Sequence, residues 1–215
     1  MTKKGRILEA VKKEKIIAII RTDDYFVAEN CTGALIEGGV KCVELTFTCR
    51  FAHTMLEKLA LKFGGNAVIG AGTVLDAETA RIALLSGAEF FVTPSLNGEV
   101  IKLGNRYGVP TFPGVASPTE AVKAMEFGAE AVKLFPASAF SPRIIGDLLA
   151  PLPALEIVPT GGVDLTNFRD WLKAGAFACG IGGSLVKGAK EGDFASVRKK
   201  AAEFRSVADE FINNF

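Results

Sequence analysis

Histidine is nearly absent from this sequence, and cysteine is sparse. Among the 215 residues there is one histidine, His53, and there are four cysteines, none of which form a C-x-x-C pair. A metal centre needs several clustered histidine, cysteine or carboxylate ligands, so we expect no metal site and no cofactor. Isolated cysteines are typical of free thiols in a reducing compartment, which predicts a cytoplasmic protein.

Long apolar runs and an excess of charge are also missing. No stretch approaches the roughly 18 apolar residues that suggest a membrane-spanning helix. The apolar segment 16–20 is too short for the core of a signal peptide, and it leads directly into Arg21. The formal net charge is +1, and the basic pairs are short and scattered. We therefore expect neither a membrane nor a nucleic acid as a partner.

A regular alternation of short apolar strands with helical segments runs through the whole sequence. The composition, 49% hydrophobic and 23% charged, fits one globular domain over residues 1–215. Helix start signals include Asp76 and the Ser117-Pro118 pair, and Gly87 and Gly128 follow predicted helix ends. Eight strands are expected, at residues 16–21, 42–46, 67–70, 90–93, 111–113, 131–135, 157–159 and 178–181.

Eight β/α units within 215 residues predict an α/β protein with a (β/α)8 TIM barrel fold. An open, doubly wound sheet is the alternative, because alternation alone does not show closure. The first strand-to-helix junction lacks a G-x-G-x-x-G motif, which favours the barrel. In such barrels the active site lies at the C-terminal ends of the strands, so the residues at these ends are the candidates for function.

Lys133 interrupts an apolar run, residues 131–136, that otherwise has the pattern of a buried strand. Burying an ammonium group is costly unless the group is paired or loses its charge. A desolvated lysine amine is a nucleophile, which makes Lys133 the candidate for covalent catalysis. The alternative is a lysine whose stem lies on apolar surface while its charged end reaches water.

Glu44 occupies an equivalent position on the second expected strand. Side chains alternate between the two faces of a strand, so Glu44 and Thr46 share one face while their apolar neighbours share the other. If the apolar side chains pack under the helices, Glu44 and Lys133 both point into the barrel. An acid and an amine in one enclosed space can divide covalent and proton-transfer work between them. The alternative is a structural ion pair of Glu44 with Lys133 or Arg21.

Glycine-rich turns follow the last two expected strands. Thr160-Gly161-Gly162 comes after the seventh strand, and Gly182-Gly183-Ser184 comes after the eighth. Barrels of this kind commonly bind phosphate between these two loops, where glycine lets backbone N–H groups approach the ligand. Either turn alone is weak evidence, since glycine also makes ordinary tight turns. The two together predict a phosphate site.

These motifs resemble the class I 2-keto-3-deoxy-6-phosphogluconate (KDPG) and 4-hydroxy-2-oxoglutarate (KHG) aldolases. The resemblance spans nearly the whole chain, through segments 37–40, 43–46, 70–74, 113–115, 132–136, 159–162 and 182–184. It implies a homotrimeric barrel in which Lys133 forms a Schiff base and Glu44 transfers protons. It also implies a pyruvate pocket at Thr73, Pro94 and Phe135, while Arg21 matches a substrate-binding arginine that part of the family carries. The implied phosphate site is at Gly161, Gly162, Gly183 and Ser184.

Thr48 marks a departure from the pattern of many members of this family. Those members carry at this position an arginine that serves the substrate's carboxylate, whereas this chain has Thr48, with Arg50 two positions later. Other members share the Thr-Phe-Thr form of residues 46–48, so activity is still expected. Thr46 and Thr48 are therefore included among the predicted substrate-binding residues.

The resemblance implies reversible, metal-independent cleavage of KDPG to pyruvate and glyceraldehyde 3-phosphate, with a small 2-keto acid as the partner. Two close alternatives are the same reaction on KHG or on the galactonate-derived epimer of KDPG. A more distant one is a phosphosugar isomerase or epimerase, in which Lys133 is an electrostatic clamp and Glu44 a base. A non-catalytic barrel would leave both residues without a function.

Overall fold

The computed structural model describes residues 1–212, and its strands run parallel to their neighbours in two sheets. The predicted strands are all present. The fifth ends before Pro113, which has no N–H to donate to a neighbouring strand, and a further short strand that was not predicted follows it. The strands within residues 1–212 are β1 (Ile16–Ile20), β2 (Cys42–Thr46), β3 (Val68–Gly72), β4 (Phe91–Val92), β5 (Thr111–Phe112), β6 (Gly114–Val115), β7 (Ala131–Leu134), β8 (Glu156–Pro159) and β9 (Cys179–Ile181).

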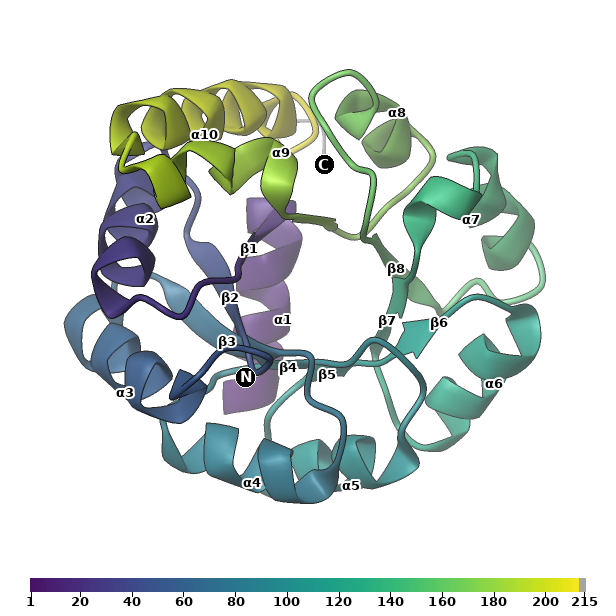
Figure 1. The fold of residues 1–215 in the computed structure, drawn as a ribbon. Coiled ribbons are helices and arrows are strands. Elements are labelled where there is room, and N and C mark those ends of the chain that lie inside the picture. Colours follow the sequence, from purple (N-terminus) through teal and green to yellow (C-terminus); the bar gives the residue numbers. More distant parts are fainter. Residues whose placement is uncertain (213–215) are drawn as a thin grey trace.

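The two sheets lie next to each other around a common interior. One sheet has the order β5-β4-β3-β2-β1-β9, and the other has the order β6-β7-β8. Only Pro113 separates β5 from β6, and a parallel bridge between Thr160 and Gly180 lies between the end of β8 and β9. In Figure 1 the strands surround the centre of the molecule and most helices lie outside them. The chain thus has an α/β fold with curved parallel sheets.

Helices connect successive strands, and several begin and end where the sequence predicts. Asp76 accepts a hydrogen bond from the Thr79 N–H at 2.6 Å, and Ser117 accepts one from the Glu120 N–H at 3.3 Å. Gly87 and Gly128 have the expected positive φ angles. No helix within residues 1–212 is long and apolar enough to cross a membrane. The helices are α1 (Lys3–Glu14), α2 (Tyr25–Glu37), α3 (Ala52–Phe63), α4 (Ala77–Leu85), α5 (Gly98–Tyr107), α6 (Pro118–Glu126), α7 (Arg143–Leu149), α8 (Phe168–Lys173), α9 (Gly183–Val186) and α10 (Phe194–Asp209), with 3₁₀ turns η1 (Ala137–Ala139) and η2 (Lys187–Glu191).

Alternation along the strands builds two separate hydrophobic cores. Val43 and Val132 belong to the larger core, which packs between the strands and the surrounding helices. Cys42 and Ala131 belong to the smaller core inside the ring of strands, which helix α1 covers at one end with residues such as Val11. Because side chains alternate, Glu44 and Lys133 point to the same interior, toward the end that α1 does not cover.

Candidate active site

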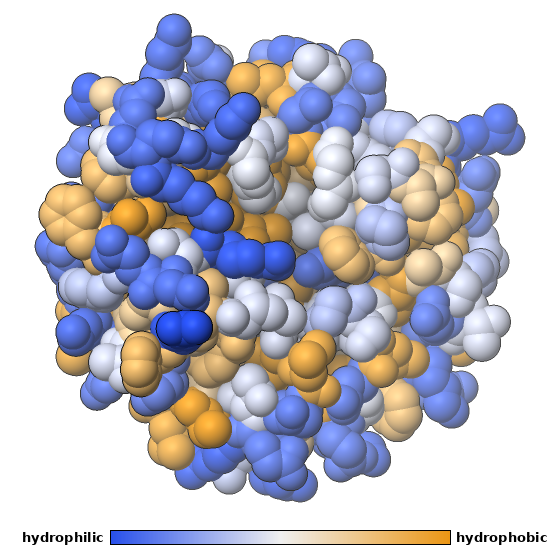
Figure 2. Space-filling model, viewed as in Figure 1, coloured by the Kyte–Doolittle hydropathy of each residue, from blue (hydrophilic) through white to orange (hydrophobic). Residues whose placement is uncertain are grey.

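A cavity of about 740 Å³ opens at the C-terminal ends of the strands. Figure 2 shows this face of the molecule, which is hollowed near its centre and has hydrophilic side chains around the opening. The cavity collects side chains from strands that are far apart in the sequence. All predicted site residues except Thr46 line it, namely Arg21, Glu44, Thr48, Thr73, Pro94, Lys133, Phe135, Thr160, Gly161, Gly162, Gly182, Gly183 and Ser184.

Lys133 lies on β7, and only 6% of its surface is exposed. Its backbone N–H donates to the Pro113 carbonyl at 2.8 Å, which fixes the strand at the base of the cavity. The Nζ atom lies 4.8 Å from the centre of the Phe135 ring, whose face attracts a cation. No hydrogen bond or ion pair within residues 1–212 occupies this nitrogen. The amine is therefore buried and still available to a ligand in the cavity.

Glu44 lies on β2 and is 2% exposed. Burial raises the pKa of Glu44, while the positive charges of Lys133 and Arg21 act in the opposite direction. Within the described part of the chain no ion pair shorter than 4.0 Å joins Glu44 to either cation. The direct ion pair that was the alternative for this residue is thus not formed, and the carboxyl group can exchange protons with a ligand.

Glycines on the neighbouring strand make room for this carboxyl group. A Cβ atom added at Gly72 on β3 would overlap Oε1 of Glu44. Thr73, the next residue, lines the cavity with a left-handed φ of 56°, which costs a threonine energy. The backbone at the end of β3 therefore departs from regular strand geometry at the point where it borders the cavity.

The two glycine-rich turns lie together at one side of the cavity. Gly161 and Gly162 have φ angles of 88° and 81°, which glycine adopts without strain. A Cβ atom at Gly162 would lie 2.8 Å from Cβ of Ser138, whereas one at Gly183 would meet no atom within 4 Å. The Ser184 hydroxyl donates to the Val163 carbonyl at 2.7 Å and so joins the two turns. Both turns line the cavity, and glycine lets backbone N–H groups come close to a ligand.

Thr46 lies behind the cavity wall and not on it. Its side chain is fully buried, and its hydroxyl accepts a hydrogen bond from the Thr48 hydroxyl at 3.2 Å. The Thr46 hydroxyl also lies 3.3 Å from Sγ of Cys49. The chain turns immediately after β2, with the Cys49 N–H bonded to the Thr46 carbonyl, and this turn brings Thr48 to the cavity. Strand alternation could not predict that turn.

Sequence reasoning missed several polar residues of the cavity wall. Lys187 and Lys190 of η2 line it, as does Asp164 after β8. The two lysines follow the Gly182-Gly183-Ser184 turn by a few positions, and this short spacing is the signal that could have identified them. Lys190 also lines a neighbouring cavity together with Arg21 and Thr48. Within residues 1–212 no three His, Cys, Asp or Glu side chains are placed to hold a metal ion.

The family model described as KDPG and KHG aldolase matches residues 7–200. The 2-dehydro-3-deoxy-6-phosphogalactonate aldolase of Escherichia coli (strain K12) is 37% identical over 178 residues, which cover 81% of this chain and 86% of the relative. The 2-dehydro-3-deoxy-phosphogluconate aldolase of Treponema pallidum (strain Nichols) is 36% identical over 196 residues, 89% of this chain and 92% of the relative.

A solved structure agrees with these relatives. It is the KDPG aldolase of Legionella pneumophila with pyruvate captured at low pH as a covalent carbinolamine intermediate. That protein is 26% identical, with a TM-score of 0.84, and the match covers 93% of this chain and 96% of the other. The matched region contains both strands that carry Glu44 and Lys133. The chain belongs to the KDPG and KHG aldolase family.

Proposed function

We propose that this chain is a class I aldolase that cleaves KDPG reversibly to pyruvate and glyceraldehyde 3-phosphate, with Lys133 as the Schiff-base residue. The observation that carries this proposal is the placement of Lys133 and Glu44 in one cavity, both nearly fully buried and not paired with each other. A buried amine beside a carboxyl group of raised pKa is suited to covalent catalysis with proton transfer.

The first half of the reaction joins the substrate to the enzyme. The free amine of Lys133 attacks the C2 carbonyl carbon and forms a carbinolamine, whose hydroxyl group leaves as water after protonation. The resulting protonated imine withdraws electrons from C3. Glu44 supplies and removes the protons of these steps, directly or through a water molecule. Its raised pKa keeps the carboxyl group able to hold a proton in the site.

The second half breaks the carbon–carbon bond. The carboxylate of Glu44 takes the proton of the C4 hydroxyl, and the C4–O bond becomes the carbonyl of glyceraldehyde 3-phosphate. The electron pair of the C3–C4 bond becomes the C2–C3 double bond, and the π electrons of the protonated imine move to its nitrogen, which leaves an enamine on Lys133. A proton returns to C3, and water hydrolyses the imine to release pyruvate and the free amine. No bond in this sequence requires a metal ion.

The two ends of the substrate are assigned to different residues of the cavity wall. Arg21 and Thr48, at the ends of β1 and β2, hold the carboxylate, with Thr73, Pro94 and Phe135 around the three carbons of pyruvate. The turns at Gly161-Gly162 and Gly183-Ser184 hold the phosphate through backbone N–H groups. Thr160 and Gly182 support these turns. The Thr160 side chain occupies the space next to Gly180, and Gly182 is the residue that precedes helix α9.

We also propose a closed barrel, a single domain, an oligomeric state and a compartment for this protein. The bridge between Thr160 and Gly180 and the continuity of β5 with β6 support a closed (β/α)8 barrel formed by a single domain, residues 1–215. We further propose a homotrimer in the cytoplasm, with a small 2-keto acid as the substrate.

A second candidate is cleavage of the galactonate-derived epimer. The relative named for that substrate is 37% identical, against 36% for the one named for the gluconate compound. The two substrates differ only in the configuration at C4, which Lys133 and Glu44 handle by the same chemistry. KHG, which lacks the phosphate, is a further candidate for the same site.

Turnover of the three compounds tests the proposal. We expect pyruvate release from KDPG to have the highest kcat/KM and to persist after EDTA treatment. Lys133→Met should abolish cleavage, whereas Lys102→Met, at an exposed lysine paired with Glu99, should leave it unchanged. A higher kcat/KM for the galactonate epimer would transfer the substrate assignment to that compound. Absence of pyruvate from all three compounds would refute the proposed activity.

A further inference from the structure

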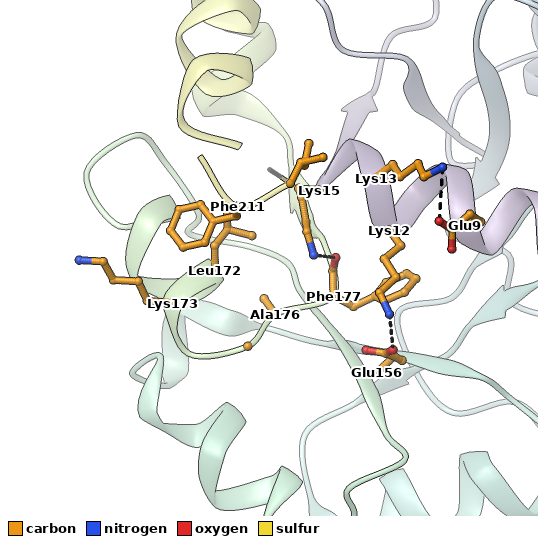
Figure 3. Close-up of a pocket in the computed structure, with 12 residues that line it drawn as sticks. Glu9, Lys12, Lys13, Lys15, Glu156, Leu172, Lys173, Ala176, Phe177 and Phe211 are labelled. Atoms are coloured by element: carbon orange, nitrogen blue, oxygen red, sulfur yellow. Dashed lines mark hydrogen bonds and ion pairs between the residues drawn. The ribbon is translucent and has the colours of Figure 1, made fainter. Parts of the chain in front are cut away.

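A second cavity, of about 780 Å³, lies at the other end of the strands. Its wall includes Lys15 immediately before β1, Glu156 at the start of β8 and Phe177 before β9, so it is located at the N-terminal ends of the strands (Figure 3). Among the described residues, none lines both this cavity and the one that contains Lys133. It is thus a separate site on the opposite face of the molecule.

Most charged groups around this cavity neutralise each other. Nζ of Lys12 lies 3.5 Å from Glu156, and Nζ of Lys13 lies 3.5 Å from Glu9. Lys173 points away from the cavity in Figure 3. Lys15 differs from all of these, because its side chain points into the cavity and its Nζ donates only to the Phe177 carbonyl, at 3.4 Å. No carboxylate within residues 1–212 lies within 4.0 Å of this ammonium group.

The backbone of Lys15 is unusual as well. It follows helix α1 with a left-handed φ of 61°, while its N–H donates to the Val11 carbonyl and caps the helix. Glycine or asparagine is the usual residue in this conformation, so lysine is a costly choice there. Burial, and next the charge of Lys12, lower the pKa of Lys15, while the negative charge of Glu156 acts in the opposite direction. The ammonium group has therefore lost part of its water, and within residues 1–212 no carboxylate lies in ion-pair contact with it.

The rest of the cavity wall is apolar. Leu172, Ala176, Phe177 and Phe211 line it, with Leu172 and Phe211 on one side of the Lys15 side chain and Phe177 on the other (Figure 3). Such a wall favours an apolar group, and a single unpaired ammonium favours a single negative charge over a phosphate dianion. We propose that this cavity binds a small organic anion with one carboxylate and an apolar body, such as an arylalkanoic acid. The carboxylate contacts Nζ of Lys15, and the apolar body packs against Leu172 and Phe211.

Isothermal titration calorimetry with 3-phenylpropionate tests this site on the full-length protein. We expect binding with a dissociation constant of about 1 mM or lower, and binding of the neutral 3-phenylpropanamide at least about 10-fold weaker. Lys15→Gly removes the ammonium and suits the left-handed backbone, so it should weaken binding of the acid about 10-fold or more. Lys15→Arg keeps the charge and should retain binding. Lys3→Gln, at an exposed lysine of helix α1 that does not line the cavity, is the control and should change affinity by less than about twofold.

The proposal is overturned if the wild-type protein does not bind the acid, if the acid and the amide bind with equal affinity, or if a folded Lys15→Gly variant binds the acid undiminished. Saturating pyruvate should leave the titration unchanged, because the two cavities share no residue of the described chain. If pyruvate competes with 3-phenylpropionate, the acid binds beside Lys133 and the second site is refuted. The comparison of acid with amide uses only wild-type protein and does not depend on how a variant folds.

Discussion

Gly72 on β3 leaves open the space that the Glu44 carboxylate on β2 occupies. A Cβ atom at Gly72 would overlap Oε1 of Glu44 and press on the rest of its carboxyl group. The two strands are directly paired, with Glu44 opposite Gly70 and Thr46 opposite Gly72. Because strand pairing fixes both backbones, the carboxylate keeps its position only while residue 72 has no side chain.

Gly72→Ala should therefore displace the Glu44 carboxyl group. We expect carbon–carbon cleavage to fall by about 10²-fold or more, since a general acid/base works only within hydrogen-bonding reach of its proton. Steady-state kinetics with KDPG measures this loss, and circular dichroism verifies the fold. Gly146→Ala, at a helical glycine where an added Cβ meets no atom within 4 Å, should retain normal turnover. Normal turnover of Gly72→Ala would mean that the exact position of Glu44 is unimportant.

Glu44→Gln tests the role of the carboxylate directly. The amide keeps the shape of the side chain but cannot accept a proton, so cleavage should fall by about 10² to 10⁴. Imine formation between pyruvate and Lys133 should remain measurable in this variant by mass spectrometry after reduction. A folded variant with near-normal turnover would reduce Glu44 to a structural residue.

The same substitution has an expected effect on stability that depends on pH. Burial raises the pKa of Glu44 in the folded protein above its ordinary value of 4.5, so the folded protein holds this proton more tightly than the unfolded chain. The contribution of Glu44 to the free energy of unfolding is therefore greatest at low pH and is lost as the pH rises past these pKa values. Glutamine does not ionise. We expect Glu44→Gln to be more stable than the wild type at about pH 8 and similar to it at about pH 4.

Urea denaturation at the two pH values measures this effect. Glu57→Gln, at an exposed carboxylate on α3, is the control for the loss of a carboxylate that is not buried. If Glu44→Gln is the less stable protein at about pH 8, the attraction of Lys133 and Arg21 for the carboxylate outweighs its burial.

Gly183→Val tests the phosphate site with little risk to the fold. An added Cβ at Gly183 meets no atom within 4 Å, in contrast to Gly162, where it would press on Ser138. Gly183 lines the cavity, so we expect a valine there to lower kcat/KM for KDPG by at least about 10-fold. The value for KHG, which has no phosphate, should change by less than about threefold. Equal losses on both substrates in a folded protein would show that these turns do not hold phosphate.

Much of the site follows from strand alternation. The apolar side chains of Val43 and Val132 pack under the helices, and this leaves Glu44 and Lys133 facing the interior, as the sequence predicts. The glycine pairs after the last two strands lie at one cavity for the same reason, because parallel strands bring their C-terminal ends together. These features are local or follow from a simple periodicity, so one sequence is enough to predict them.

Other features depend on contacts that cannot be predicted from the alternation of side chains along a strand. Thr46 is on the same face of β2 as Glu44, but it does not line the cavity. The turn after β2 brings Thr48 to the cavity wall instead, and the Thr48 hydroxyl donates to that of Thr46. Lys15 belongs to a basic helix end in the sequence, and only the folded chain shows its ammonium group in an apolar cavity. The short strand at Gly114–Val115 lies beyond the end of the strand that the sequence predicts at 111–113. Each of these is decided by backbone geometry at the end of an element, where sequence patterns are weakest.

Borohydride trapping with pyruvate tests the central claim, that Lys133 forms the Schiff base. The amine condenses with the ketone of pyruvate, and reduction of the imine prevents its hydrolysis. Mass mapping of peptides should find one reduced pyruvyl group per chain, attached to Lys133, with loss of turnover in proportion to labelling. The cavity lysines Lys187 and Lys190 should remain unmodified. Labelling of either of these in place of Lys133, or no labelling of a protein that turns over KDPG, would contradict the account.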